Sequence, residues 1–277
     1  MGTLLALASA LCYGLADFTG GLLARRASFV TVALAGQVGG LTLSLVLAPV
    51  VATGTPVAAD LGWGALSGVG TGAGMLFLYR GLGRGAMSVV VPISAIGGVA
   101  LPVLVGVAFL GDHPSALSSI GIALSLPALW LVSQTRRHGE PTTAAALDGL
   151  IAGAGIALQY LALAQAEPRA GLWPVVAGRV AATLCLVPLA LGARAADGPG
   201  PRVLLLAAGP GAIAAMALSF YLAATREQLL VVAVVLSSLY PAIPVLLGVT
   251  ALRERLSWKQ TLGLVGAAAA IGLLSIG

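Results

Sequence analysis

Two ionisable side chains stand out within the long apolar stretches of this sequence. Asp17 belongs to the stretch 4–23 and follows Tyr13 by four residues, so a helix would place both side chains on one face. Arg179 belongs to the stretch 171–192. Inserting a charged residue into a membrane span costs about 2.5–3.5 kcal/mol, which makes such residues candidates for function. Asp17 is a candidate for binding a cationic group or a coupling proton, and Arg179 for contacting a substrate.

Both residues also have purely structural interpretations. The Asp17 carboxylate could bond to a neighbouring helix or lie close enough to the membrane surface to reach water. The Arg179 guanidinium could reach the surface in the same way, or donate to backbone carbonyls. The residue types alone leave these alternatives open.

Polar aromatic residues form the second group of candidates. Tyr79, Tyr160, Tyr221 and Tyr240 lie in apolar stretches or at their ends. A tyrosine ring stacks against an organic solute while its hydroxyl bonds to it, which suits a binding cavity. Aromatic residues also gather at membrane surfaces without binding anything. The full set of cavity candidates is Tyr13, Asp17, Tyr79, Gln159, Tyr160, Arg179, Tyr221 and Tyr240.

The composition identifies the class of protein that must position these residues. Of the 277 residues, 59% are hydrophobic and 8% charged, and the mean hydropathy is +1.04. Soluble domains contain about 25% charged residues, so this chain is expected to be a multi-pass membrane protein. The net charge of +5 does not indicate nucleic-acid binding, because the basic residues fall between apolar stretches. Cys12 and Cys185 lie within such stretches, where neither a disulfide nor a metal site is expected.

A membrane-spanning helix needs about 20 apolar residues, and this length divides the chain into ten spans. The first stretch lacks a basic leader segment and contains Asp17, so it is expected to be a span and not a signal peptide. The expected spans are 4–23, 29–51, 61–80, 86–110, 116–134, 145–166, 171–192, 203–224, 229–252 and 259–276.

The two halves of the chain, 1–138 and 139–277, resemble each other at an offset of 142 residues. Between 79–133 and 221–275, sixteen of fifty-five aligned pairs are identical. The offset also pairs Asp17 with Gln159 and Gln37 with Arg179. Five spans in each half is an odd number, so the second half is expected to enter the membrane inverted, with both halves forming one bundle.

Charges and prolines add expectations about orientation and bending. The gaps after the odd-numbered spans hold eleven of the fourteen basic residues, which predicts that these gaps are cytoplasmic and both termini external. Pro92 and Pro102 lie in one span, and Pro241 and Pro244 in its counterpart, so both spans are expected to bend at the cavity.

Two further features have expected structural roles. Gly64, Gly68 and Gly72 recur at every fourth residue and are expected to pack helices closely. Asp112 and Glu254, equivalent residues beyond the proline-containing spans, are interpreted as solvated helix ends, with a gate or pairing with Arg253 and Arg255 as the alternative.

The stretch SLYPAIPVLLGVTALRERLS, residues 238–257, resembles the second-repeat signature of the drug/metabolite transporter superfamily, EamA type. The first copy, from YRGLGRG at 79 to GDHPS at 111, is similar but has Asp112-His113 in place of Glu-Arg. The resemblance implies ten helices in two inverted halves around a central cavity, which move small solutes by alternating access. It also implies that both termini are cytoplasmic, in conflict with the charges.

The expected function is secondary transport of an amino acid, metabolite or cationic drug, most simply export. Nutrient uptake and translocation of a lipid-linked group are alternatives, and a non-transporting structural or receptor-like role is an alternative of another class. An enzyme is not expected, since His113 and His138 lie in loops and no metal-binding or nucleophile motif occurs.

The expected partners are a small-molecule substrate, the lipid bilayer and, as a candidate coupling ion, protons. No cofactor and no nucleic acid are expected, and the protein is expected to be a monomer or homodimer in the plasma membrane of a bacterium.

Overall fold

The structure is a computed structural model, and it describes residues 1–277 except 25–26, 84–86, 135–142, 193–200 and 254. Within these described ranges the chain is helical and contains no strand. The helices are α1 (Gly2–Leu23), α2 (Phe29–Val51), α3 (Ala58–Gly83), α4 (Met87–Phe109), α5 (Ala116–Val132), α6 (Thr143–Ala164), the short 3-10 helix η1 (Pro168–Ala170), α7 (Trp173–Gly192), α8 (Pro201–Ala224), α9 (Leu230–Ser238), α10 (Ala242–Leu252) and α11 (Trp258–Ile276).

Among the residues that the structure describes, eight helical segments are long and apolar enough to cross a membrane. One of them, Leu230–Leu252, comprises α9 and α10 together. Two shorter apolar helices, Ala116–Val132 and Trp173–Pro188, accompany them. These segments make the chain an integral, all-helical membrane protein, as its composition predicts.

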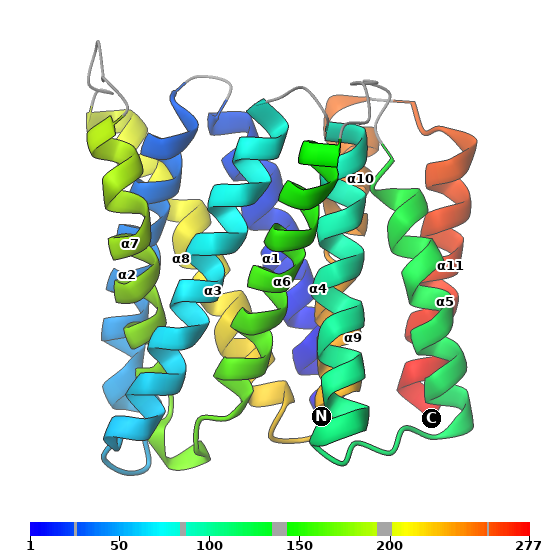
Figure 1. Ribbon diagram of the computed structural model, residues 1–277, viewed down its shortest axis with the longest axis horizontal. Coiled ribbons are helices and arrows are strands. Elements are labelled where there is room, and N and C mark those ends of the chain that lie inside the picture. Colours follow the sequence, from blue (N-terminus) through cyan, green and yellow to red (C-terminus); the bar gives the residue numbers. More distant parts are fainter. Residues whose placement is uncertain (25–26, 84–86, 135–142, 193–200, 254) are drawn as a thin grey trace.

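The long helices run side by side, and both termini lie at the same end of the bundle (Figure 1). We call this end the terminal face. At the opposite end α3 finishes, α8 begins and α10 finishes (Figure 1). Arg80 lies in the last turn of α3, Arg202 in the first turn of α8 and Arg253 at the end of α10. We call this opposite end the arginine end.

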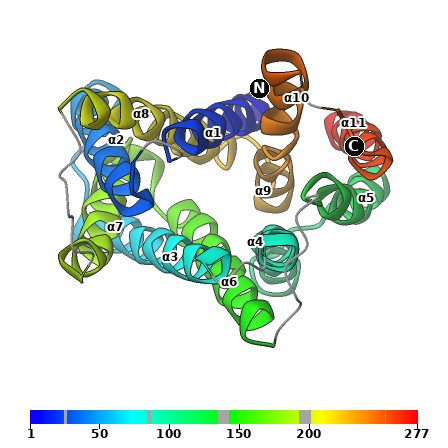
Figure 2. The ribbon, with the colours of Figure 1, turned by 90° about the horizontal axis from the view of Figure 1, so that it is seen from above.

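Helix contacts join elements that are distant in the sequence. α1 packs against α8, and α3 packs against both α6 and α7. α2 packs against α7 and α8, and α4 packs against α6. α5 and α11 pack mainly against each other at one side of the bundle (Figure 2).

The glycines of α3 account for its close contacts with two neighbours. A Cβ added at Gly64 or Gly68 would overlap the backbone of α7 at Pro174 or Gly178. One added at Gly70 would overlap the backbone of α6 at Gly155. Small residues of this kind let membrane helices approach closely. The expected packing role of these glycines is confirmed.

The apolar segment Leu230–Leu252 is broken near its middle. α9 ends at Ser238 and α10 begins at Ala242, because Pro241 has no N–H to donate to the carbonyl of Ser237. Tighter bonds bridge the break: Ala242 N donates to Leu239 O at 3.1 Å, and Ile243 N donates to Tyr240 O at 3.0 Å.

The corresponding helix of the first half, α4, continues through Pro92 and Pro102. The residue that aligns with Pro241 is Val99, which retains its N–H. Of the four prolines expected to bend a helix, only Pro241 lies at an interruption. The two halves therefore differ at Pro241: this helix is interrupted in the second half and continuous in the first.

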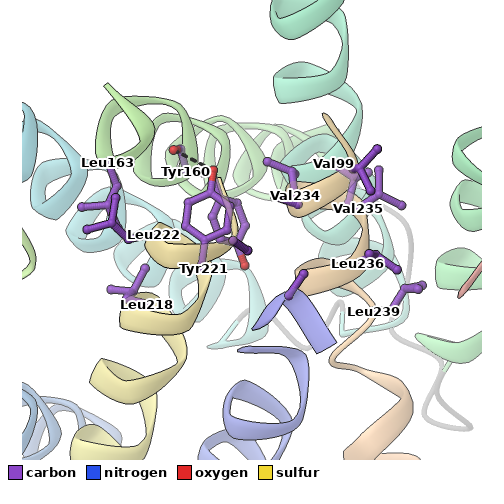
Figure 3. Packing of buried hydrophobic residues seen from close by; sticks show 14 of the residues in the cluster. Val99, Tyr160, Leu163, Leu218, Tyr221, Leu222, Val234, Val235, Leu236 and Leu239 are labelled. Carbon is purple, nitrogen blue, oxygen red and sulfur yellow. Dashed lines mark hydrogen bonds between the residues drawn. The ribbon is translucent and has the colours of Figure 1, made fainter. Parts of the chain in front are cut away.

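The most densely buried region lies toward the terminal face. Every residue from Val231 to Ser238 is buried, so α9 is enclosed on all sides. Tyr160 of α6 and Tyr221 of α8 are also enclosed and lie beside Leu222 and Leu218 (Figure 3). This packed layer closes the interior of the bundle on the terminal side.

Candidate functional site

Two adjoining cavities lie between the packed layer and the arginine end. The first, here called the central cavity, has a volume of about 420 Å³ and is lined by α1, α2, α3, α6, α7 and α8 together with Tyr240. The second, here called the α10 cavity, has a volume of about 600 Å³ and extends to Gln134, Arg255 and Gln260. Asp17 and Tyr240 line both cavities. Gly21, Leu78 and Ile156 also line both, so the two cavities adjoin along these five residues.

Asp17 is an exposed carboxylate on the wall shared by the two cavities. It lies in α1, one helical turn beyond Tyr13, and both residues line the central cavity, as the spacing predicts. No hydrogen bond or ion pair to Asp17 occurs among the residues that the structure describes. A carboxylate accepts hydrogen bonds at both oxygens when ionised, so Asp17 has its bonding capacity free for a ligand.

A hydrogen-bond chain fixes the phenol of Tyr13. Gln159 Nε2 donates to Tyr13 Oη at 2.9 Å, and Thr71 Oγ1 donates to Gln159 Oε1 at 2.7 Å. Ser67 Oγ donates to the backbone oxygen of Gln159 at 2.9 Å and ties α3 to α6 at the same level. Gln159 thus orients a neighbouring aromatic residue as well as lining the central cavity.

Four tyrosines form a connected aromatic group between the central cavity and the packed layer. The ring centroid of Tyr13 lies 5.7 Å from that of Tyr240 and 6.5 Å from that of Tyr160. The ring centroids of Tyr160 and Tyr221 are 4.6 Å apart. Tyr221 Oη donates a hydrogen bond to the backbone oxygen of Tyr160 at 3.0 Å. Tyr13, Tyr160 and Tyr240 line the central cavity, whereas Tyr221 lies in the buried layer below it. Tyr79 belongs to α3, but its side chain lies outside the described part.

Arg179 brings a guanidinium to the central cavity. Its side chain is 5% exposed, and its Nη1 donates to Gln37 Oε1 at 3.2 Å. Its Nε is buried and has no hydrogen-bond partner. Gln37 Nε2 in turn lies 3.6 Å from Met75 Sδ. The guanidinium is therefore held by one neutral side chain and not by a carboxylate.

The candidate prolines separate into two groups. Pro241 and Pro244 line the α10 cavity, on the same side as Tyr240. Pro92 and Pro102 are buried in α4 and belong to the lining of neither cavity. The interruption at Pro241 places Tyr240 and the free ends of two helices beside the cavities. Interrupted helices at this depth are tolerated where backbone groups line a cavity.

The terminal face is closed by carboxylates that accept backbone hydrogen bonds. Asp112 Oδ2 accepts from Val231 N at 2.8 Å, at the start of α9. Asp112 is buried, so its expected role as a solvated helix end is wrong: it joins the end of α4 to the start of α9. Glu254, its counterpart, lies outside the described residues. Asp60 Oδ1 accepts from Glu167 N at 3.0 Å and joins the first turn of α3 to the segment between α6 and α7 in a similar way.

Two arginines also form bonds at the terminal face. Arg169 Nε lies 2.8 Å from Glu167 Oε2, and Gly54 N donates to Arg169 O at 3.1 Å. Arg226 Nη2 donates to Gly171 O at 3.2 Å. Burial lowers the pKa of the Arg226 guanidinium, and the nearby carboxylate of Asp60 opposes this shift.

Sequence reasoning missed one ion pair, whose carboxylate is buried. Arg80 Nη2 lies 2.6 Å from Asp148 Oδ1, and the Asp148 side chain is fully buried. The Arg80 guanidinium also lies 4.4 Å from the ring centre of Phe77. Asp148 falls inside an apolar stretch and could have been recognised by the criterion that identified Asp17. This pair joins α3 to α6 outside the lining of the two cavities.

Comparison with known proteins supports the fold. No protein-family model matches the chain, and no curated protein matches it. A solved structure described as "Crystal structure of protein" superposes with a TM-score of 0.72, over 99% of this chain and 96% of that one. The two sequences are 16% identical, so the likeness extends to the fold alone.

Proposed function

We propose that the protein is a secondary transporter that moves a small organic solute across a bacterial plasma membrane by alternating access. The observation that carries this proposal is the position of Asp17. Its exposed, unpaired carboxylate lies between a cavity that extends to the arginine end and a packed layer that closes the terminal face. A charged group in a span is costly to insert, which favours a role in binding. Volumes of 420 and 600 Å³ suit small-molecule ligands.

We further propose ten membrane crossings in two inverted five-helix halves, as in EamA-type drug/metabolite transporters. Eight apolar segments and two shorter apolar helices supply ten crossings, and an even number agrees with termini at one end. The contact of α1 with α8 corresponds, 142 residues apart, to that of α6 with α3. The aligned residues Gln37 and Arg179 bond to each other, which is expected beside a pseudo-two-fold axis.

The distribution of charge favours one orientation. The arginine end carries Arg80, Arg202, Arg253, Arg255 and Lys259. The basic residues at the terminal face, Arg169 and Arg226, are accompanied there by acidic ones. The positive-inside rule then places the arginine end in the cytoplasm. In this orientation the cavities face the cytoplasm, as an exporter awaiting its substrate would.

A substitution of Asp17 tests the proposed function. Asp17→Asn removes the charge and keeps the size, so we expect at least a tenfold loss of counterflow in proteoliposomes for the solute that best stabilises the wild type. Glu227→Gln is the matched control, because Glu227 is an exposed carboxylate in the loop between α8 and α9. Normal counterflow by a well-inserted Asp17→Asn protein would contradict the role given to Asp17.

Uptake remains the second candidate, because the same geometry operating in reverse would import a solute. Export is favoured because the cavities face the cytoplasm, and this direction depends on the orientation derived from the basic residues. A structural or receptor-like role has less support, since it leaves both the unpaired carboxylate and the interrupted helix without a purpose.

A further inference from the structure

A third cavity lies between the last turns of α1 and the early turns of α8. We call it the α1–α8 groove; its volume is about 550 Å³. It is lined by Thr19, Leu22, Leu23, Leu206, Gly209, Pro210 and Ile213. Of these, only Thr19 has a polar side chain, and its hydroxyl donates to Leu15 O at 2.7 Å within its own helix. α1 and α8 pack together at one edge of the bundle (Figure 2), and Leu206 is 61% exposed. The groove is therefore apolar and opens toward the bilayer.

The repeat explains why the groove exists on this side of the bundle. At the offset of 142 residues, its α8 residues align with Gly64, Ser67, Gly68 and Thr71 of α3. In α3 the two glycines lie against the backbone of α7, and the two hydroxyls bond to Gln159 of α6. The α8 counterparts have no hydroxyl, and a Cβ added at Gly209 would meet nothing within 4 Å. α8 therefore lacks the side chains that tie α3 to its neighbour, and a groove remains beside α1.

The end of α1 has little support from the protein. None of the residues from Asp17 to Ala24 is buried. Leu22 lines the α10 cavity as well as the groove, and Pro210 lines the central cavity as well as the groove. The two cavities lie on the inner sides of this helix end and the groove on its outer side. An empty groove would forfeit dispersion contacts along its walls, so a chain from the bilayer stabilises it by filling it.

One basic residue lies in register with the groove. Arg202, in the first turn of α8, is exposed and precedes Leu206 by four residues and Ile213 by eleven. This spacing places it on the groove face of α8. At 1.5 Å per residue it lies about 16 Å along the helix axis from Ile213. One leaflet of the hydrocarbon core is about 15 Å thick, so the groove reaches from the level of Arg202 toward the middle of the bilayer.

We propose that the α1–α8 groove binds one acyl chain of an anionic phospholipid, whose phosphate is held by Arg202. The chain fills the groove and supports the end of α1 from outside, while the guanidinium bonds to the phosphate. A zwitterionic lipid with the same chains fits the groove equally well, but its ammonium group is repelled by Arg202. The site should therefore select the anionic headgroup. This lipid site is independent of the transport activity proposed above.

Two lipids that differ only in the headgroup test the inference. The purified protein is delipidated in detergent and titrated with dioleoylphosphatidylglycerol or dioleoylphosphatidylcholine, and bound lipids are counted by native mass spectrometry. We expect one phosphatidylglycerol to be retained with a dissociation constant about tenfold below that of phosphatidylcholine, because only the anionic lipid keeps a full charge-assisted bond. The same lipid should raise the melting temperature more than phosphatidylcholine does, since it binds the folded protein.

Two variants assign the headgroup and the chain to their places. Arg202→Gln should remove the tenfold preference, whereas Lys259→Gln, an exposed cation in the first turn of α11 at the same end, should keep it. Gly209→Phe fills the groove and should weaken retention of phosphatidylglycerol about tenfold. Gly272→Phe is its matched control, because a Cβ at Gly272 of α11 also meets nothing within 4 Å. Arg202→Gln changes an exposed side chain, so its result does not depend on how well Gly209→Phe folds.

Several results would overturn the inference. Equal retention of the two lipids by the wild type would remove the role of Arg202, and normal retention by a monodisperse Gly209→Phe protein would remove the role of the groove. Equal loss of preference in Arg202→Gln and Lys259→Gln would replace a defined site with a general attraction of the basic end for anions. Because these measurements involve no transported solute, any of these outcomes leaves the transporter proposal standing.

Discussion

Replacing Pro241 with valine should convert the second half's interrupted helix into a copy of α4. Valine stands at the aligned position 99, where α4 is continuous. The new N–H could donate to the carbonyl of Ser237, four residues earlier, and so join α9 to α10. One backbone hydrogen bond contributes about 0.5–1.5 kcal/mol, and removing proline from a helix interior relieves up to about 3 kcal/mol. We therefore expect the continuous form to gain about 1–3 kcal/mol over the interrupted one.

This gain should appear as higher stability and weaker binding. Tyr240 lies at the interruption and lines both cavities, so a continuous helix would rotate it away from its present place. A shift of 1.4 kcal/mol changes an equilibrium tenfold, and apparent affinity falls with the population of the competent form. We expect a raised melting temperature in nanodiscs and solute affinity lowered by about tenfold.

Pro244→Val is the matched control. Pro244 lies in the first turn of α10, where a backbone N–H has no helical acceptor in any case. This substitution should change both quantities little. If Pro241→Val and Pro244→Val behave alike, the interruption at Pro241 does not have the role given to it here.

Two further substitutions test the packing and closure of the bundle. Asp112→Ala should lower the free energy of unfolding by about 1–3 kcal/mol, because it leaves the buried Val231 N–H without its acceptor. Asp112→Asn keeps an acceptor and should lower it less. Equal melting temperatures for the two variants would contradict this reasoning. Gly68→Leu should prevent α3 from reaching α7 and abolish the monodisperse peak in gel filtration. Gly62→Leu should be tolerated, because a Cβ added at Gly62 meets nothing within 4 Å. Normal elution profiles for both Gly68→Leu and Gly62→Leu would contradict the role given to close glycine packing.

Much of the fold is predictable from the sequence because a membrane limits the choices. A span must be long, apolar and helical, so counting apolar stretches locates the helices to within a few residues. The spacing of Tyr13 and Asp17 also suffices to place them on one face. The helical period depends on local geometry alone, and neighbouring helices do not alter it.

The partners of buried polar groups are harder to predict. The bond from Thr71 to Gln159, and that from Asp112 to Val231, depend on how each helix is rotated against its neighbours. Nothing in the local sequence around Asp112 distinguishes a solvated helix end from a buried acceptor. The break between α9 and α10 is only partly predictable. Pro241 indicates where a break could occur. However, α4 continues through Pro102, so a proline in a membrane helix need not interrupt it.

Side-resolved cysteine labelling tests alternating access most directly. In a Cys12→Ala, Cys185→Ala background, Gly21→Cys reports on the cavities, which it lines with free space around it. Ser237→Cys reports on the packed layer, because Ser237 is 0% exposed. Leu205 is 77% exposed on the outside of the bundle, so Leu205→Cys is the control for labelling through lipid.

We predict that a charged, membrane-impermeant thiol reagent labels Gly21→Cys from the cytoplasmic side. Solute supplied in counterflow should slow that labelling and open Ser237→Cys to reagent from the opposite side, with Leu205→Cys unlabelled throughout. Labelling of Gly21→Cys and Ser237→Cys from one and the same side, unchanged by any solute, would contradict alternating access. Labelling of Gly21→Cys only from outside would reverse the orientation derived from the charges.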